Sequence, residues 1–347
     1  RNKMALIHGG QLQQVAEQYK IPVTDWLDLS TGIAPISYPI PNIPLCAWQQ
    51  LPQLSPKLIA TAKQYYQCSE LVITNGSQSI IKTLPELYRQ QNMASQDVYL
   101  PERGYKEHAQ AWKVAGFKLH FYQETLPEIT ELKPNSVVVI INPNNPTGQF
   151  FPRDIIKQYH QRLKQLNGLL VVDEAFIDVM PKEQSYCPQT SDAHVLVLRS
   201  FGKFFGLAGI RIGFLVADNY WCQKFNDLLG PWQVNGPAQI IAEKALGDHT
   251  WHNQQRDKLH TLREQQEALL RQVFTSKLVS NIHGCDLFLT LSFHQPDNAK
   301  ALYHLLCKQG VYCRLSDEQD TLRFGIALEQ DFKRLENACR QACNALT

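Results

Sequence analysis

The sequence lacks long apolar runs, a strong net charge and the pattern of a secreted chain. Its longest apolar runs have only the length of a strand, so we expect no membrane span and no membrane partner. The net charge is +2 and no basic run is interleaved with aromatics, so we expect no nucleic-acid partner. The N-terminal residues do not follow the charged, apolar and small-residue order of a secretory signal.

Paired cysteines and clustered metal ligands are missing too. The nine cysteines are scattered, and none belongs to a C-x-x-C pair. Cys339 and Cys343 share a helix face, but no histidine or second pair accompanies them. An odd number of scattered cysteines favours free thiols in a reducing compartment over a disulfide scaffold or a zinc site. We therefore expect a cytoplasmic protein that holds no metal.

The chain is long enough for two domains, with 347 residues of which 44% are hydrophobic. Five prolines between Pro22 and Pro44 exclude a long regular element, so residues 1–45 are expected to form an arm across a neighbouring surface. Short apolar strands alternate with helices over 46–235, which predicts a large α/β domain with a parallel sheet. Linking helices over 236–274 and a small α/β domain over 275–347 follow. The strands expected in the small domain lie near 286–293, 311–314 and 321–327.

A phosphate site is predicted where the strand 71–74 passes into a helix expected over 79–88. The connection is Asn75-Gly76-Ser77-Gln78. Backbone N–H groups and the positive end of a helix dipole meet at such a turn, and both favour a phosphate. An ordinary βα turn would have the same residues, so both interpretations stand at this point.

Two further apolar runs end in polar residues. The run 136–141 ends in N-P-N-N-P-T-G, and the run 168–172 ends in Asp173-Glu174-Ala175-Phe176. Open α/β sheets bind their ligands at the carboxyl ends of the strands. We therefore expect a site along this edge of the sheet.

A single lysine occupies a Gly-rich loop between two strands, in R-S-F-G-K-F-F-G-L-A-G-I-R. Lys203 has Gly202 and aromatic residues as neighbours, and desolvation there favours the neutral amine, a nucleophile towards carbonyls. Ser200 and Arg211 add a hydroxyl and a planar cation, which suit a phosphate. The alternative is a buried strand-loop-strand whose lysine reaches out to solvent.

Taken together, N-P-N-N-P-T-G, V-V-D-E-A-F and S-F-G-K-F-F-G-L-A-G-I-R-I-G resemble the fold-type-I pyridoxal-phosphate enzymes, the aspartate-aminotransferase-like superfamily. The resemblance covers essentially the whole chain. It implies a mostly parallel seven-stranded sheet, a smaller α/β domain, pyridoxal 5'-phosphate as cofactor and a homodimer. Lys203 would bond to the cofactor aldehyde and carry protons at Cα, and Asp173 would keep the ring nitrogen protonated. The other cofactor-binding residues that it implies are Gly76, Ser77, Gln78, Tyr105, Asn145, Phe176, Ser200 and Arg211.

Two positions depart from the pattern of that superfamily. Phe176 stands where many relatives have tyrosine, so one hydroxyl near the ring oxygen is missing. Leu51-Pro52 stands where many have Tyr-Pro in the segment that reaches the partner's cofactor. Leucine has no hydroxyl to offer the phosphate there.

Four further motifs narrow the resemblance, namely M-A-L-I-H-G-G-Q, W-L-D-L-S-T-G-I-A-P, D-E-A-F-I-D and P-W-Q-V-N. They resemble the cobalamin-biosynthetic L-threonine-O-3-phosphate decarboxylases, which make (R)-1-amino-2-propanol O-2-phosphate. Histidinol-phosphate aminotransferases, with the same fold and cofactor, are the alternative, and a non-catalytic binding protein of this fold is a more distant one.

The narrower resemblance also implies a set of substrate contacts. A substrate with a phosphate and a carboxylate suits two arginines and a Gly-rich arm. Gly32 stands where some members have asparagine, so a contact there would use the backbone. Whether CO₂ or a proton leaves Cα depends on which anion each arginine holds, and the sequence leaves that open. The implied substrate-binding residues are His8, Gly9, Gly32, Asn145, Arg314 and Arg323.

Overall fold

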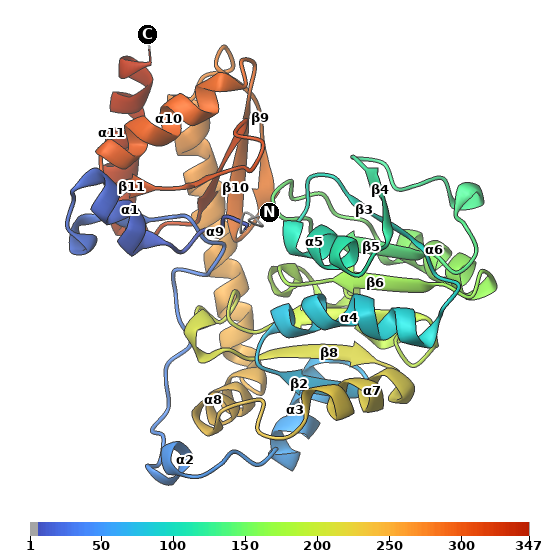
Figure 1. Cartoon of the computed structure of the whole chain (residues 1–347). Helices are drawn as coiled ribbons and strands as arrows, with labels where there is room; N and C mark the ends of the chain where they lie inside the picture. The colour runs from blue at the N-terminus through green and yellow to red at the C-terminus, as the bar shows by residue number, and fades with distance from the viewer. Residues whose placement is uncertain (1–5, 347) are drawn as a thin grey trace. The chain divides into compact units, whose positions relative to one another are not determined.

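The computed structural model describes residues 6–346 and divides into two compact units (Figure 1). Unit 1 contains the chain up to Ile36, the segment Pro146–Gly148 and the chain from Asn253 onward. Unit 2 contains Ser37–Asn145 and Gln149–His252. The first five residues of the expected arm, with the Met4-Ala5 start of its motif, lie outside the described residues. The domain boundaries after residues 45, 235 and 274 remain a proposal.

Unit 2 is built on a seven-stranded sheet with the order β2-β8-β7-β6-β5-β3-β4. The neighbours from β7 to β4 pair in parallel, whereas β8 runs antiparallel to both β2 and β7. This confirms the mostly parallel seven-stranded sheet. The strands are β2 (Leu71–Thr74), β3 (Asp97–Pro101), β4 (Lys118–Tyr122), β5 (Val137–Ile141), β6 (Leu169–Asp173), β7 (Val195–Ser200) and β8 (Gly213–Ala217).

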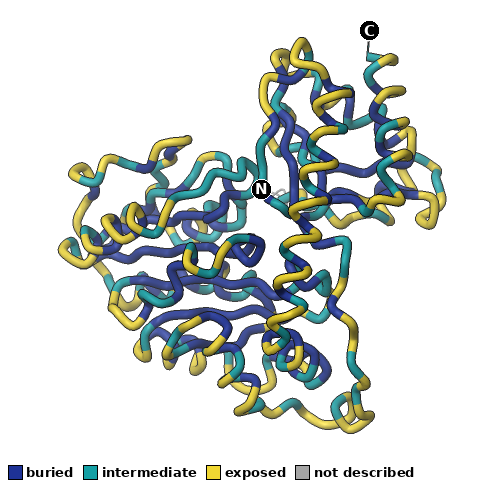
Figure 2. The backbone as a smooth tube through the Cα atoms, turned by 180° about the vertical axis from the view of Figure 1, so that it is seen from behind, coloured by how far each residue is buried: buried dark blue, intermediate teal, exposed yellow. Residues whose placement is uncertain are grey.

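The central strands of this sheet are buried on both faces, because helices cover both. Val137, Val139 and Ile141 of β5 pack in one apolar cluster with residues of α4, α5 and α7. Figure 2 shows the buried strands running between helices whose outer surfaces are exposed. A parallel strand covered on both sides needs apolar residues at every position, as its sequence has. The helices of unit 2 are α2 (Cys46–Gln49), α3 (Pro56–Tyr66), α4 (Ser77–Gln91), α5 (Lys106–Val114), α6 (Arg153–Gln165), α7 (Asn219–Leu229) and α8 (Gly236–Leu246).

Several helix ends follow from local capping. The Ser55 hydroxyl accepts a hydrogen bond from Leu58 N at 3.2 Å and so begins α3. Helix α4 begins at Ser77, two residues before the expected start at 79. The single helical stretch expected up to residue 274 is divided into α8 and α9 (His249–Val273). Asp248 stands between them, and its side chain accepts from Trp251 N at 3.1 Å.

Unit 1 contains an antiparallel four-stranded sheet with the order β12-β13-β10-β9 and a two-stranded parallel sheet of β1 and β11. The strand β9 was not expected, because polar residues interrupt the sequence V-S-N-I-H-G-C. The strands of unit 1 are β1 (Leu27–Asp28), β9 (Val279–Cys285), β10 (Phe288–Phe293), β11 (Val311–Tyr312), β12 (Arg314–Leu315) and β13 (Thr321–Gly325). Its helices are α1 (Leu12–Tyr19), α9, α10 (Asp297–Lys308) and α11 (Glu329–Ala345).

Much of the expected arm is an integral part of unit 1. Val15 and Ala16 of α1 pack with Cys307 and Tyr312, and β1 pairs with β11. These contacts pack α1 and β1, both from the arm, against elements from the far end of the chain. Within residues 6–346, no helix combines the length and the apolar character that a bilayer span requires.

Candidate active site

The start of α4 forms one wall of the candidate site in unit 2. Gly76 precedes the helix with a φ of 114°, and a Cβ there would lie 2.5 Å from Nη2 of Arg211. The guanidinium therefore lies directly against the bare Cα of Gly76. Ser77 Oγ lies 3.3 Å from Ser200 Oγ. Two hydroxyls, a guanidinium and a helix N-terminus thus converge, and this set of donors fits a phosphate group.

The strand register explains why these residues meet. Gly213 at the start of β8 pairs with Thr74 on one side and with Ser200 on the other. The carboxyl ends of β2 and β7 therefore flank the same point. Arg211 comes two residues earlier in a left-handed conformation, with a φ of 56°. Non-glycine residues adopt this conformation rarely, and here it ends the turn before β8.

Asp173 at the end of β6 is a buried carboxylate with two hydrogen-bond donors. Nε2 of His108 donates to its Oδ2 at 2.7 Å, and Ala175 N donates to its Oδ1 at 3.0 Å. Burial opposes ionisation, but the bond and charge of His108, the charge of Lys203 and the Ala175 N–H outweigh it and lower the pKa of Asp173. The group is therefore an anion that can pair with a protonated ring nitrogen.

His108 is a site residue that the sequence reading missed. Its ring lies edge-on to that of Tyr105, with 6.1 Å between the centroids. The two residues are three positions apart at the start of α5, where helix periodicity places side chains on one face. That spacing was the available signal, because Tyr105 was already assigned to the site.

Lys203 lies in a loop that buried aromatic residues anchor. The rings of Phe201 and Phe205 stack with 4.2 Å between their centroids, and Phe204 is fully buried. Nζ of Lys203 lies 3.5 Å from Ser200 Oγ and 5.3 Å from the ring centroid of Phe176. Because the charge of Lys203 also lowers the pKa of Asp173, the amine and the carboxylate belong to one site.

Tyr105 and Gln78 are joined across this site. The Tyr105 hydroxyl donates to Gln78 Oε1 at 2.8 Å. Burial, and then the carboxylates of Glu107 and Asp173, raise the pKa of Tyr105. The phenol therefore stays neutral, and its ring is available as an apolar wall beside the carboxylate.

The asparagines of the N-P-N-N-P-T-G loop have different roles. Asn142 bonds the chain to itself, since its Nδ2 donates to Phe151 O at 2.9 Å and its Oδ1 accepts from Phe151 N at 2.8 Å. Asn144 Nδ2 donates to Arg103 O at 2.6 Å. These two residues shape the loop, and Asn145 follows them half-buried at the end of its segment of unit 2.

Glu174, directly after Asp173, belongs to a separate buried network. It accepts from Ser185 Oγ at 2.6 Å and lies 3.7 Å from Nη1 of Arg199. Nη2 of Arg199 donates to Asp178 at 2.8 Å. Burial raises the pKa of Glu174, although Arg199 counteracts it. This network ties together the chain segments that follow β6 and end β7, and we assign it a structural role.

The residues expected to bind substrate, Asn145 apart, all lie in unit 1. A Cβ at Gly9 would lie 2.1 Å from Ser30 O, so this glycine allows the backbone of residues 8–10 to pack on Ser30. Nη2 of Arg323 donates to the same carbonyl at 2.8 Å. Half-buried His8 precedes Gly9, and Gly32 is buried beyond Ser30.

Arg314 and Arg323 lie directly opposite each other on β12 and β13. Burial, followed by the charge of Arg314, lowers the pKa of Arg323 to about 10. Like charges at opposite positions of a strand pair destabilise it. A bound anion would relieve both the desolvation and the repulsion, which supports an anion site here.

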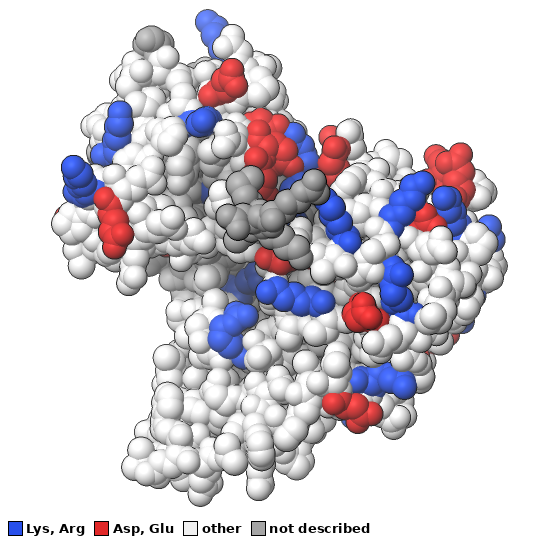
Figure 3. Space-filling model, viewed as in Figure 1, with Lys and Arg blue, Asp and Glu red and all other residues white. Residues whose placement is uncertain are grey.

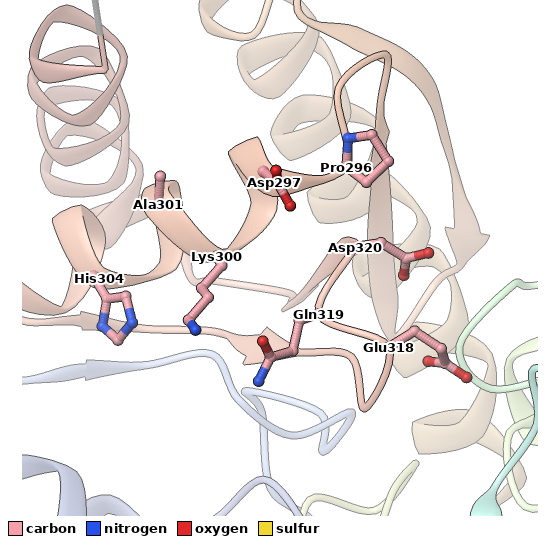
Figure 4. A pocket seen from close by; sticks show the side chains of 8 residues that line it. All are labelled: Pro296, Asp297, Lys300, Ala301, His304, Glu318, Gln319 and Asp320. Atoms are coloured by element: carbon pink, nitrogen blue, oxygen red, sulfur yellow. The ribbon is translucent and has the colours of Figure 1, made fainter.

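A separate cavity of about 410 Å³ lies on unit 1, between the start of α10 and the turn at 318–320 (Figure 4). The side chains of Lys300, His304 and Gln319 extend into it. None of the expected site residues lines this cavity. It carries charges of both signs and points to no ligand class.

Comparison with known proteins places the chain among characterised relatives. Residues 48–340 match the family described as aminotransferase class I and II. Threonine-phosphate decarboxylase from Pseudomonas aeruginosa is 38% identical over 334 residues, covering 96% of this chain and 97% of the relative. The protein of that name from a Sinorhizobium species is 33% identical over 327 residues, covering 93% of each.

A solved structure shares the fold. Histidinol-phosphate aminotransferase from Sinorhizobium meliloti, in complex with pyridoxal-5'-phosphate, superposes with a TM-score of 0.79. The alignment covers 99% of this chain and 100% of that one at 18% identity. The likeness therefore extends through both units of the chain.

Proposed function

Since the chain belongs to the aminotransferase class I and II family, we propose that it decarboxylates L-threonine O-3-phosphate to (R)-1-amino-2-propanol O-2-phosphate, a step of cobalamin biosynthesis. The observation that carries the proposal is the identity of 38% and 33% with threonine-phosphate decarboxylases over almost the whole chain. Histidinol-phosphate aminotransferase from Shewanella amazonensis, which represents the alternative, is 30% identical over a smaller share of this chain, 79%. The enzyme is pyridoxal-phosphate-dependent, as its family is.

The residues of unit 2 fit the cofactor. When bound, pyridoxal 5'-phosphate supplies an electron sink for the bond that breaks at Cα of the substrate. We propose that Arg211, Ser77, Ser200 and the backbone at Gly76 hold its phosphate. Asp173, kept ionised by His108, would pair with the ring nitrogen. The further contacts that we propose are Gln78, Tyr105, Asn145 and Phe176.

Lys203 is the proposed catalytic residue. Its amine would bond the cofactor aldehyde in the resting enzyme and become free when an amino acid takes its place. It could then deliver a proton to Cα after CO₂ leaves. Phe176 beside the amine offers a ring face and no hydroxyl, so this wall of the site neither donates nor accepts a proton.

We propose that Arg314 and Arg323 bind the anionic groups of the substrate, with His8, Gly9, Gly32 and Asn145 as further contacts. The argument is electrostatic, because two arginines at opposite strand positions favour a ligand of high negative charge. L-Threonine O-3-phosphate carries both a phosphate and a carboxylate.

Incubation of the purified holoenzyme with L-threonine O-3-phosphate tests the reaction. We expect CO₂ release without any 2-oxo acid acceptor. The absence of CO₂, together with 2-oxoglutarate-dependent turnover of histidinol phosphate, would replace this proposal by the aminotransferase alternative.

We also propose a homodimer, which the apolar surface of unit 2 supports. Residues 37–56, at the start of this unit, contain no Asp, Glu, Lys or Arg. Within this stretch Trp48 is 65% exposed and Leu51 is 66% exposed. Figure 3 shows the surface over α2 and α8 without charged side chains on the face in view. An uncharged surface with large exposed apolar side chains is typical of an interface, and a second copy of the chain is the occupant that we propose.

A cytoplasmic location is proposed from the thiols. All nine cysteines are free. Free thiols in this number suit a reducing compartment. Detection of the native protein in the soluble cytoplasmic fraction of its source cells, with all nine thiols reactive after denaturation, would support this location.

A further inference from the structure

Both terminal nitrogens of the Arg314 guanidinium already donate hydrogen bonds. Nη2 of its guanidinium donates to Asp317 Oδ1 at 2.9 Å and to Ile7 O at 2.7 Å. Nη1 donates to the carbonyl of Leu315. A guanidinium binds a phosphate or carboxylate in a bidentate manner, through two parallel N–H groups. The two pairs of nitrogens that can do this are Nε with Nη2 and Nη1 with Nη2, so both pairs include Nη2. An anion can therefore engage Arg314 in this way only after one of the acceptors on Nη2 has left.

Asp317 is held beside Arg314 by the turn that joins β12 and β13. Ser316 N donates to Thr321 O at 3.1 Å. Ser316 Oγ accepts from the backbone N–H groups of Asp320 at 3.1 Å and of Thr321 at 3.0 Å. These bonds fix the backbone on both sides of Asp317. Its carboxylate therefore stays close to the guanidinium with little loss of conformational entropy.

Two arginines and one acid carry opposing charges at this strand pair. Arg323 lies directly opposite Arg314 and is half-buried, with a bond to Ser30 O. Asp317 neutralises one of the two positive charges and lies three residues from Arg314. An incoming anion therefore meets a smaller positive charge than the two arginines alone would present.

We propose that Asp317 is an internal competitor for Arg314 and thereby sets how tightly this site holds a phosphate-bearing ligand. The proposal rests on the proposed function, in which substrate and product both carry the phosphate. The ligand takes Arg314 from Asp317 when it binds, and Asp317 regains the guanidinium when the ligand leaves. The residue thus weakens retention of the product and favours its release.

Inorganic phosphate is the probe, titrated calorimetrically into the holoenzyme, whose cofactor fills the other anion site. For Asp317→Asn we expect binding about two- to fivefold tighter than for the unchanged protein, the range of a partly exposed ion pair. Asp320→Asn is the matched control. It removes the same charge from the same turn, and its amide oxygen can still accept the bond from Ser316 Oγ. We expect its affinity for phosphate to stay near that of the unchanged protein.

A double-mutant cycle with Arg314→Gln separates direct competition from a general charge effect. We expect Asp317→Asn to tighten binding only where Arg314 is present. Equal affinity of Asp317→Asn and the unchanged protein, an equal gain in Asp320→Asn, or a gain that persists without Arg314 would each overturn the proposal. Asp317→Ser serves as a second variant if Asp317→Asn does not fold.

The outcomes distinguish this inference from the proposed reaction. Phosphate binding requires no turnover, so tighter binding by Asp317→Asn without CO₂ release would leave the competitor role and reject the decarboxylase. CO₂ release together with unchanged phosphate binding by Asp317→Asn would leave the decarboxylase and reject the competitor role. Loss of measurable phosphate binding in every variant would remove the anion site itself, and the competitor role with it.

Discussion

Replacement of His108 by phenylalanine tests the electrostatics of the cofactor unit most directly. The change keeps an aromatic ring and removes the donor that lies 2.7 Å from Asp173. Asp173 would then remain buried with only the Ala175 N–H and the more distant charge of Lys203. Leaving a buried carboxylate without its partner costs about 3–5 kcal/mol. A slope of about 2–3 kcal/mol per molar urea translates this cost into a midpoint lower by about 1–2.5 M at pH 7.

The effect should depend on pH with a definite sign. In the unchanged protein the lowered pKa of Asp173 means a stabilising contribution that is present above about pH 4 and is lost as the pH falls through the lowered value. In His108→Phe, burial dominates and raises the pKa above the ordinary value. The buried charge then destabilises at neutral pH, and protonation relieves the cost as the pH falls. The gap in the free energy of unfolding between the two proteins should therefore narrow between pH 7 and about pH 4.

Urea unfolding of the apoprotein in a double-mutant cycle with Asp173→Asn measures this coupling. With a neutral amide at position 173, loss of His108 should cost only about 1 kcal/mol, the value of an ordinary hydrogen bond. A cost of His108→Phe that is equal in both backgrounds, or a gap that stays constant with pH, would refute the reasoning. The role of His108 would then be packing alone.

Three further predictions concern the cofactor site and the interface. Lys203→Ala should abolish the yellow absorbance of the cofactor-loaded protein and all turnover, whereas other lysine variants keep both; retained absorbance in Lys203→Ala would contradict the assignment. Gly76→Ala should weaken cofactor affinity about tenfold or more in a fluorescence titration, because its Cβ would clash with Arg211 and the φ of 114° is unfavourable for alanine. Gly209→Ala is the control, since a Cβ at Gly209 would meet no atom within 4 Å, and it should bind the cofactor normally. Trp48→Glu should shift the protein from dimer to monomer in light scattering, and an unchanged mass would place the interface elsewhere.

The sheet of unit 2 could be predicted because its sequence signals are local. Each central strand is an apolar run, and each ends in a turn rich in glycine, asparagine or acid. Parallel strands bring their carboxyl ends to one edge, so the runs that end before Asn142 and Asp173 predicted a site along that edge. The strand β9 could not be predicted in this way, because exposed and half-exposed polar residues interrupt its apolar residues.

The contacts of the site join residues that lie far apart in the sequence, so no local sequence pattern predicts them. His108 reaches Asp173 over 65 positions of sequence, and Ser77 reaches Ser200 over 123. In unit 1, Arg314 reaches Ile7 over 307 positions. The sequence supplied the residue types for a phosphate and a ring nitrogen. Only the three-residue spacing from Tyr105 indicated His108 as a site residue, and no local pattern indicated which acid would hold an arginine.

The pairs Asp173/Glu174 and Arg199/Ser200 show what decides the role of adjacent residues. Successive side chains of a strand leave it on opposite faces. Leu169 and Val171 of β6, like Leu196 and Leu198 of β7, pack on the face that α4 and α5 cover. Asp173 and Ser200 continue these two series and therefore meet His108 of α5 and Ser77 of α4 on that face. Arg199 has the other parity and pairs with Asp178. In runs that are apolar at every position, hydrophobicity does not reveal which residues face α4 and α5. The sequence could therefore place Asp173 and Glu174 at the edge of the sheet. It could not tell which of them belongs to the site and which to the buried network behind it.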